Sequence, residues 1–242
     1  MRKLIFGEIY RLLHKKSMYA YFGAVAAGYI LFAFVRSGGF NEESIPSDAV
    51  ELFTFLPAVA GGFLFSAIYT DDLNAKNLIT LVGYGLDKIK IVFAKFILAL
   101  LFVTVCFWLV PLFHCAVYTV LGCAATLSLM AMVYVFSFKF MLMTLAYIVF
   151  SSIVAFGLQR ATFAMVTYIL FAFNIINVML TSAAKALKLN LGGHLLSGVT
   201  DRIIAGMITG GSLIFPLMEY AAYIIIALAF SALAFHKKEM EF

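Results

Sequence analysis

Long uncharged runs alternate with short charged segments along this chain. Uncharged runs cover residues 17–35, 52–70, 96–138, 140–159 and 161–184. An α-helix needs about 20 apolar residues to cross the hydrocarbon core of a bilayer. The pattern therefore predicts membrane-spanning helices, and we expect six of them at about residues 18–35, 52–70, 91–113, 138–158, 162–182 and 217–235.

Composition supports a location in the membrane. Of the 242 residues, 64% are hydrophobic and 12% are charged, and the mean hydropathy is +1.06. A soluble domain of this length cannot bury so much apolar surface. We therefore expect an all-α integral membrane protein, with one transmembrane domain covering residues 1–242.

The beginning of the chain has the pattern of an amphipathic helix at residues 2–16. Apolar residues recur on one face at the period of an α-helix, and basic residues lie on the opposite face. Such a helix lies in the headgroup plane, with its basic side chains toward anionic lipid. The residues expected to place this helix at the interface are Ile5, Glu8, Ile9, Arg11, Leu12 and Lys15.

Residues 71–95 form the longest charged interruption between two apolar runs in the first half of the chain. Their middle part, residues 75–82, has the pattern of a two-turn amphipathic helix, and Asn74 is placed to cap its N-terminus. Gly83 and Gly85 then interrupt the helix. We expect either a solvated loop with a short interfacial helix, or an element on which a soluble partner docks.

Two further segments interrupt the apolar pattern. Residues 36–51 are acidic and contain no lysine, which favours a loop on the outer side of the membrane. Residues 203–215 are apolar but contain glycines, which favours a re-entrant or interfacial segment before the last span. Within the second span, the adjacent Gly61 and Gly62 indicate a close helix contact or a bend.

Basic residues indicate the orientation of the spans. With six spans and both termini in the cytoplasm, 12 lysines and arginines fall inside and 5 fall outside, as the positive-inside rule requires. Dividing the 43 uncharged residues at 96–138 into two spans gives seven spans, with 13 basic residues inside and 4 outside. Charge alone therefore does not decide between six and seven spans.

Few polar side chains interrupt the expected spans. Glu219 lies near the start of the last span, where either pairing with a basic residue of the preceding loop or a role as a gate explains it. Asn174 and Asn177 are three residues apart, so we expect them to face one side of the fifth span. They serve there either in a hydrogen bond between helices or in a transport pathway. Lys95 and Lys139 are expected to extend to the membrane surfaces.

The three cysteines, Cys106, Cys115 and Cys123, lie in apolar sequence. Their odd number favours reduced, buried thiols, with a bridge between Cys115 and Cys123 as the alternative. His114 next to Cys115 does not indicate a metal site, because a zinc centre needs further ligands at suitable spacing. Lysines on the cytoplasmic face suffice to explain the basic residues, so no nucleic acid partner is expected.

Four features follow one another along the chain. They are the opening helix with Glu8, Tyr10, Arg11, Lys15 and Lys16, the segment from Lys76 to Leu81 followed by Gly85, Lys88, Ile89 and Lys95, the turn Leu158-Gln159-Arg160, and a glycine-rich segment before the last span with a short basic tail. In this order they resemble the type-2 permease subunits of ATP-binding-cassette transporters, a group that includes bacterial antibiotic and peptide exporters. The resemblance favours six spans. At Gly83-Tyr84-Gly85 the chain departs from the family pattern, in which proline and arginine are common.

The resemblance implies a half-transporter in a bacterial cell membrane, working with a second permease copy or paralogue and two separate ATPase subunits. Its substrates would be amphipathic peptides, antimicrobials or lipid-like molecules. The chain lacks a Gly-x-x-x-x-Gly-Lys-Ser/Thr phosphate loop, so we expect it to bind no cofactor and not to be an enzyme by itself, with ATP and Mg on the partner subunits. The resemblance implies ATPase docking through Asn74, Ala75, Lys76, Asn77, Leu78, Ile79, Thr80 and Leu81.

Two other functions remain open at this stage. An ion-coupled secondary transporter would need paired carboxylates or discontinuous helices in the middle of the membrane, and the sequence offers only Glu219 near a span. A non-transporting immunity or sensor subunit is the other alternative. An ATPase that purifies with the chain would favour the permease.

Overall fold

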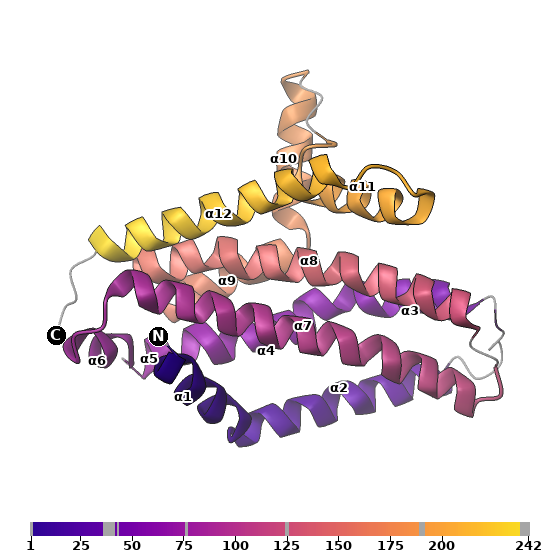
Figure 1. Ribbon diagram of the computed structural model, residues 1–242, viewed down its shortest axis with the longest axis horizontal. Helices are drawn as coiled ribbons and strands as arrows, with labels where there is room; N and C mark the ends of the chain where they lie inside the picture. Colours follow the sequence, from indigo (N-terminus) through magenta and orange to yellow (C-terminus); the bar gives the residue numbers. More distant parts are fainter. Residues whose placement is uncertain are drawn as a thin grey trace.

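The computed structural model describes residues 2–35, 42, 44–75, 77–123, 126–188 and 192–237, and the regular structure in these ranges is entirely helical (Figure 1). The helices are α1 (Arg2–Leu13), α2 (Lys16–Val35), α3 (Ser44–Leu56), η1 (Pro57–Gly61), α4 (Gly62–Phe65), η2 (Ser66–Thr70), α5 (Asp71–Asn74), α6 (Asn77–Gly83), α7 (Lys88–Val120), α8 (Leu127–Leu158), α9 (Ala161–Ala172), α10 (Ile175–Ala186), α11 (Leu196–Thr209) and α12 (Ile214–Lys237). The expected all-α fold is therefore confirmed.

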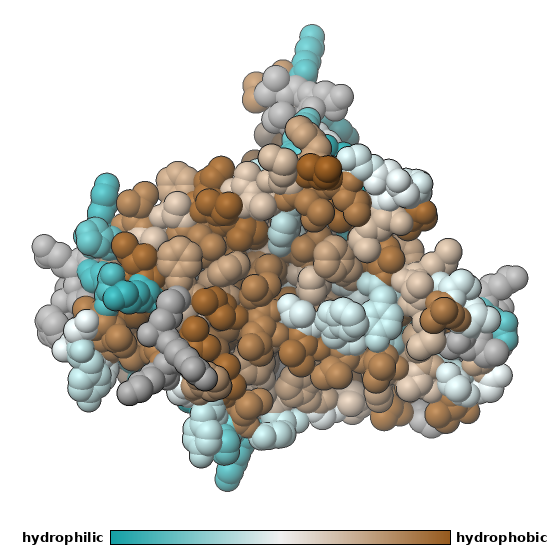
Figure 2. Space-filling model, viewed as in Figure 1, coloured by the Kyte–Doolittle hydropathy of each residue, from teal (hydrophilic) through white to brown (hydrophobic). Residues whose placement is uncertain are grey.

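Within the described residues, four helices are long and apolar enough to cross a membrane. They are Ser44–Asn74, Lys88–Val120, Leu127–Leu158 and Ile214–Lys237. The pair α9 and α10 makes a fifth if the two bent helices count as one span. The helices of the bundle run roughly along one direction, and an apolar surface covers much of its length (Figures 1 and 2). A membrane-embedded protein is the consistent interpretation.

Helices α7 and α8 are longer than the sequence predicted. They contain 33 and 32 residues, which is about 50 Å each and exceeds the roughly 30 Å of a hydrocarbon core. Helix α7 continues past Pro111 to Val120, and α8 starts at Leu127 rather than near residue 138. Because α8 is continuous through Lys139, residues 96–138 hold the end of one helix and the start of the next. The division of this run that would give a seventh span is wrong.

The expected outer loop at residues 36–51 is also partly helical. One continuous helical segment of 31 residues begins at Ser44 and ends at Asn74, while residues 36–41 and 43 lie outside the described part. The acidic Asp48 is only 1% exposed, and its buried carboxylate accepts a hydrogen bond from the Tyr118 hydroxyl. A charged side chain that suggested a solvated loop thus faces the protein interior.

The expected fifth span, residues 162–182, is not a single straight helix. Helices α9 and α10 meet at an angle of 64°, and Asn174 at the break has a left-handed backbone with φ of 61°. Helix α10 then projects away from the bundle (Figure 1). Asn174 therefore precedes α10 instead of sharing a helix face with Asn177, and that part of the prediction is wrong.

The segment before the last span contains a 14-residue helix, α11, which begins at Leu196 and turns at residues 210–213 into α12. At about 21 Å it is too short to cross a bilayer, as expected, but its bounds differ from the predicted 203–215. Helix α11 packs on α8 and α12. Gly210 has a left-handed backbone and ends α11. The last long helix then begins at Ile214, so residues 214 and 215 belong to it.

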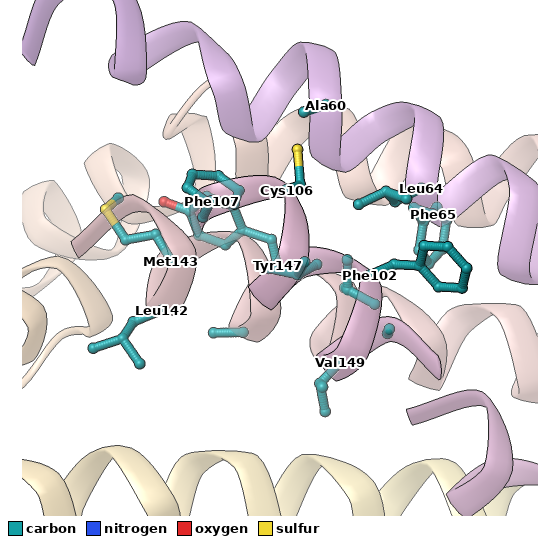
Figure 3. Packing of buried hydrophobic residues seen from close by; sticks show 14 of the residues in the cluster. Ala60, Leu64, Phe65, Phe102, Cys106, Phe107, Leu142, Met143, Tyr147 and Val149 are labelled. Carbon is teal, nitrogen blue, oxygen red and sulfur yellow. The ribbon is translucent and has the colours of Figure 1, made fainter. Parts of the chain in front are cut away.

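The core lies where α3–α5, α7, α8 and α12 pack together. Figure 3 shows part of it, with labelled side chains Ala60, Leu64, Phe65, Phe102, Cys106, Phe107, Leu142, Met143, Tyr147 and Val149. The glycine pair marks a close helix contact, as predicted: a Cβ at Gly61 would lie 2.0 Å from the Tyr168 hydroxyl. The cysteines are free and buried, as expected.

Candidate functional site

Helices α1 and α5 and the start of α7 lie at one end of the bundle, close to the start of the chain (Figure 1), and charged side chains from all three meet there. They come from α1, from α5 at the end of the second long helix, and from α7 two turns after its start. We call the group of Glu8, Arg11, Asp72 and Lys95 the ionic cluster. It contains two acidic and two basic groups, so its formal charges balance.

Lys95 and Asp72 form the buried centre of the ionic cluster. Their side chains are 3% and 1% exposed, and the Lys95 ammonium group is paired directly with the Asp72 carboxylate. Lys95 therefore does not extend to the membrane surface, and the expectation for this residue is wrong. The ammonium group of Lys95 loses its hydration when it is buried, and the ion pair with the Asp72 carboxylate replaces the hydrogen bonds to water. This pairing explains why the charge can be buried.

Glu8 and Arg11 connect α1 to this centre. Lys95 Nζ lies 3.1 Å from Glu8 Oε2, and Arg11 Nη2 donates to the same Glu8 oxygen at 2.7 Å. Arg11 Nη1 lies 3.1 Å from Asp72 Oδ1. Burial lowers the pKa of Arg11, but the hydrogen bond that Arg11 donates to Glu8 and the charges of Asp72 and Glu8 outweigh this effect and raise the pKa, so the guanidinium stays charged.

Two further contacts surround the ionic cluster. The Asn77 amide donates to Asp72 Oδ1 at 3.1 Å, which ties the start of α6 to the buried carboxylate. Lys15 pairs with Asp71, and both side chains are about one third exposed. Because exposed ion pairs contribute little to stability, the Lys15–Asp71 pair adds less than the buried centre.

The local sequence explains why these side chains converge. Glu8 and Arg11 are three residues apart on α1 and so lie on one face, next to the buried Leu12. On α7, Lys95 continues a buried face that includes Ile91 and Leu98, and it therefore points inward.

Two π-helical turns precede Asp72 in the second long helix, at Pro57–Gly61 and Ser66–Thr70. A π turn accommodates one residue more than an α turn, which rotates the following side chains by about 100°. Tyr168 donates a 2.5 Å hydrogen bond to the Pro57 carbonyl, a group in the first π turn. The second π turn ends directly before Asp71, so it sets the direction in which Asp72 points.

The predicted docking segment lies at the same end of the molecule. Asn74 is the last residue of α5 and does not cap the following helix, because α6 begins at Asn77; the predicted cap is wrong. Lys76 lies outside the described residues. Leu78 is buried and anchors α6, whereas Asn74, Ala75 and Thr80 are exposed and Asn77, Ile79 and Leu81 are half-buried.

Sequence reasoning missed one exposed aromatic residue. Tyr84 follows α6 with 82% of its surface exposed, between α6 and the left-handed Gly85 with φ of 79°. The side chain of Asp87 then caps α7 by accepting from the Ile89 amide at 3.1 Å. An aromatic residue between two glycines in a polar loop was the available signal, because an exposed tyrosine is a frequent anchor of protein interfaces.

The expected interfacial positions of α1 do not separate into one apolar face toward the protein and one charged face toward lipid headgroups. Leu12 is buried, Ile5 and Ile9 are partly buried against the core, and Glu8 and Arg11 join the ionic cluster. The helix thus turns both apolar and charged side chains toward the protein, which the sequence pattern had assigned to opposite environments.

The candidate gate residues are not brought together with the ionic cluster. Glu219 on α12 pairs with Arg202 of α11 and accepts from His194 at 2.9 Å, so the predicted pairing with a preceding basic residue is confirmed. The Asn177 amide donates to Ser197 at 2.5 Å and links α10 to α11. This is the expected hydrogen bond between helices. Lys139 pairs with Asp201 at 2.6 Å.

In comparisons with known proteins, no family model, no curated protein and no solved structure matches the chain. Among the described residues, no group of three or more histidine, cysteine, aspartate or glutamate side chains is arranged to hold a metal ion. What the ionic cluster offers is a mechanical connection between helices.

Proposed function

We propose that this chain is the membrane-spanning permease subunit of an ATP-driven exporter. The observation that carries the proposal is the ionic cluster, which joins α1, the end of the second long helix and the start of α7 directly behind an exposed loop. A force applied to that loop reaches three helices at once. This is the property that a docking element for a separate ATPase requires, since rigid-body motion must pass from the partner to the spans.

The proposed topology has six spans with both termini in the cytoplasm of a bacterial cell. The spans are α2, the Ser44–Asn74 helix, α7, α8, the bent pair α9–α10, and α12. Helix α2 is the span that this proposal adds to the four long helices and the bent pair described above, because it contains 20 residues with a single charge at Lys16 and is about 30 Å long. Basic residues support this orientation, because Lys15, Lys88 and Arg160 stand at the starts of α2, α7 and α9, and the proposed topology puts all three starts on the cytoplasmic side.

The proposed partners are two ATPase subunits and a second permease copy or paralogue. Residues 74–81 together with Tyr84 would form the contact with an ATPase, with Leu78 holding α6 in place from inside. ATP and Mg would be bound by those partners. The substrate would be an amphipathic peptide, an antimicrobial or a lipid-like molecule that reaches the pathway from the bilayer.

Co-purification tests this proposal. The tagged full-length chain is co-expressed with an ATPase encoded beside it that carries a phosphate-loop motif, and the detergent-solubilised complex is isolated. Tyr84→Ala should weaken the complex about 10–30-fold, as expected for an aromatic anchor. Leu127→Ala is the matched control, since Leu127 is 84% exposed but lies at the start of α8.

Equal affinities for the two variants would overturn the assignment of the docking surface. Failure to recover any ATPase, together with transport by the isolated chain, would overturn the permease proposal. Labelling of a cysteine introduced at position 84 from the outer side alone would reverse the proposed orientation.

A second candidate function is an ion-coupled secondary transporter. Two observations favour it: the break between α9 and α10 at Asn174, and the buried Asp48 that accepts a hydrogen bond from Tyr118. Discontinuous helices and buried carboxylates are typical of ion sites in such proteins. Transport that stops when an ionophore collapses the ion gradient, and that continues without nucleotide, would identify this alternative.

A further inference from the structure

An apolar cavity separates α2 from the rest of the bundle. Its volume is about 700 Å³, and it lies between α2, the middle of the second long helix and the middle of α7. The lining is almost entirely apolar and includes Val25, Leu56, Ala60, Val105 and Leu109. A volume of this size is within the range of small-molecule sites in proteins, which is about 300–1,000 Å³.

The cavity opens to the apolar outer surface. Several of its lining side chains are also well exposed, and Phe55, Val59 and Leu109 are 63%, 49% and 57% exposed. These side chains belong both to the cavity and to the surface that faces lipid in a membrane-embedded protein. Water cannot fill such a space favourably, because the lining offers almost no hydrogen-bond partners. The occupant must therefore come from the bilayer.

The side chains of α2 that line the cavity indicate the length of that occupant. Met18 lines the cavity near the start of α2 and Tyr29 lines it toward the other end. These residues are 11 positions apart, which is about 16 Å along a helix and about half of a 30 Å hydrocarbon core. This length corresponds to one lipid chain in one leaflet, on the side of the bundle that carries α1.

At the far end of this space, helix α2 is tied to its neighbours by hydrogen bonds. The Tyr29 hydroxyl and His114 Nδ1 share a 2.5 Å hydrogen bond, and His114 Nε2 lies 3.0 Å from the Ile45 carbonyl. A carbonyl only accepts, so Nε2 carries the proton and Tyr29 donates to Nδ1. This neutral chain of contacts fixes the position of Tyr29 and ends the cavity with an aromatic wall that includes Phe113.

We infer that this cavity is a binding site for one acyl chain of a membrane phospholipid, in the leaflet on the α1 side. The chain enters sideways between α2 and α7 and lies along α2 from Met18 toward Tyr29. The site differs from ordinary lipid contact because it is lined by two long helical segments and α2 and is closed at the Tyr29 end. Its occupation should therefore saturate.

Photolabelling tests this inference with the full-length chain in vesicles. The probe is a phosphatidylcholine that carries a diazirine in one acyl chain, and the labelled residues are found by mass spectrometry. Labelling around Val25, Val105 and Leu109 should saturate as the mole fraction of probe rises. Labelling around Ile225, which is 65% exposed on α12, should rise linearly because it reports only bulk lipid.

Two glycines of α2 provide matched variants. A Cβ at Gly28 or at Gly23 would meet no atom within 4 Å, and of the two only Gly28 lines the cavity. Gly28→Leu should abolish the saturable labelling, whereas Gly23→Leu should retain it. The thermal midpoints of both variants, measured in the same vesicles, show that each remains folded.

Three results would overturn the inference: linear labelling around Val105, equal loss in both glycine variants, or saturable labelling only by a free single-chain amphiphile. The last result would assign the cavity to a transported molecule instead of a bilayer lipid. The experiment needs no ATPase, so its outcome is independent of the proposed permease function.

Discussion

In the part of the chain that the structure describes, two groups of ion pairs differ in how deeply they are buried. The ionic cluster centres on Lys95 and Asp72, whose side chains are 3% and 1% exposed. The pairs around α11, namely Arg202 with Glu219 and Lys139 with Asp201, have side chains between 18% and 59% exposed. A buried pair is costly to break because the remaining charge has no water to solvate it, whereas an exposed partner is replaced by water.

The comparison shows that charge and position in the sequence do not reveal burial. Lys95 and Lys139 both lie next to long apolar runs, and both were expected to extend to a membrane surface. Lys139 is 26% exposed and reaches an exposed aspartate, so its environment is close to the expected one. Lys95 is enclosed because α1 folds back over the start of α7 and contributes a second carboxylate, from Glu8.

The largest effect is expected for Lys95→Met. It leaves Asp72 buried beside Arg11 but without its main partner, and the free energy of unfolding should fall by about 3–5 kcal/mol. Denaturant titration of the chain in mixed micelles, followed by circular dichroism, measures this value. Lys90→Met on the same helix is the control, because Lys90 is exposed and should change stability by less than about 0.5 kcal/mol.

A second variant separates the loss of a pair from the loss of packing. Lys95→Met combined with Asp72→Leu removes both members and leaves Glu8 paired with Arg11, so it should recover most of the lost stability. A double variant as unstable as Lys95→Met alone would contradict the electrostatic explanation.

An intermediate effect is expected for Arg11→Met. Arg11 is 33% exposed and donates charged hydrogen bonds to Glu8, so its replacement should cost about 1.5–3 kcal/mol. Lys15→Met, which removes the exposed pair with Asp71, should cost no more than about 1 kcal/mol. The same titration measures both, and a larger loss for Lys15→Met would reverse the ranking by burial.

A smaller effect is expected for Glu219→Gln. The carboxylate is partly exposed and pairs with Arg202 and His194, so the loss should be about 0.2–1 kcal/mol. A double-mutant cycle with Arg202→Met measures the coupling between the two side chains. A loss as large as that of Lys95→Met would show that the α11 pairs are also buried in the assembled protein.

The smallest expected change in stability is the effect of salt on these variants. Raising the ionic strength screens exposed charges more than buried ones, so the destabilisation caused by Lys139→Met should vanish at high salt, while that of Lys95→Met should persist. Thermal midpoints at two salt concentrations test this, and equal salt sensitivity would contradict the difference in burial.

Most of the helices could be predicted, because an apolar run of about 20 residues in a membrane must form a helix to satisfy its backbone hydrogen bonds. The helix ends were less predictable. Ser44 to Glu51 has a polar sequence but is helical, since Asp48 finds a partner 70 residues later in Tyr118. The break at Asn174 escaped prediction because the surrounding run, residues 161–184, carries no charge and is typical of one continuous span. Asparagine adopts a left-handed backbone more readily than most residues, so Asn174 was the available signal.

The candidate site was predictable in its location but not in its contacts. The segment at residues 71–95 was identified from its charges, and α6 forms within it. The partners of Asp72 come from α1 and α7, and this convergence depends on the tertiary fold. Tyr84 was visible in the sequence, but its exposure follows from the end of α6 and the turn at Gly85.

The π turn at Ser66–Thr70 makes the pairing of Asp72 with Lys95 depend on the number of residues in the second long helix. Removing one residue there would turn the π turn into an α turn and leave a helix still long enough to cross the bilayer. The carboxylate of Asp72 would then point about 100° away from Lys95. Within this helix, insertions and deletions should therefore be tolerated less well than conservative replacements of the same residues.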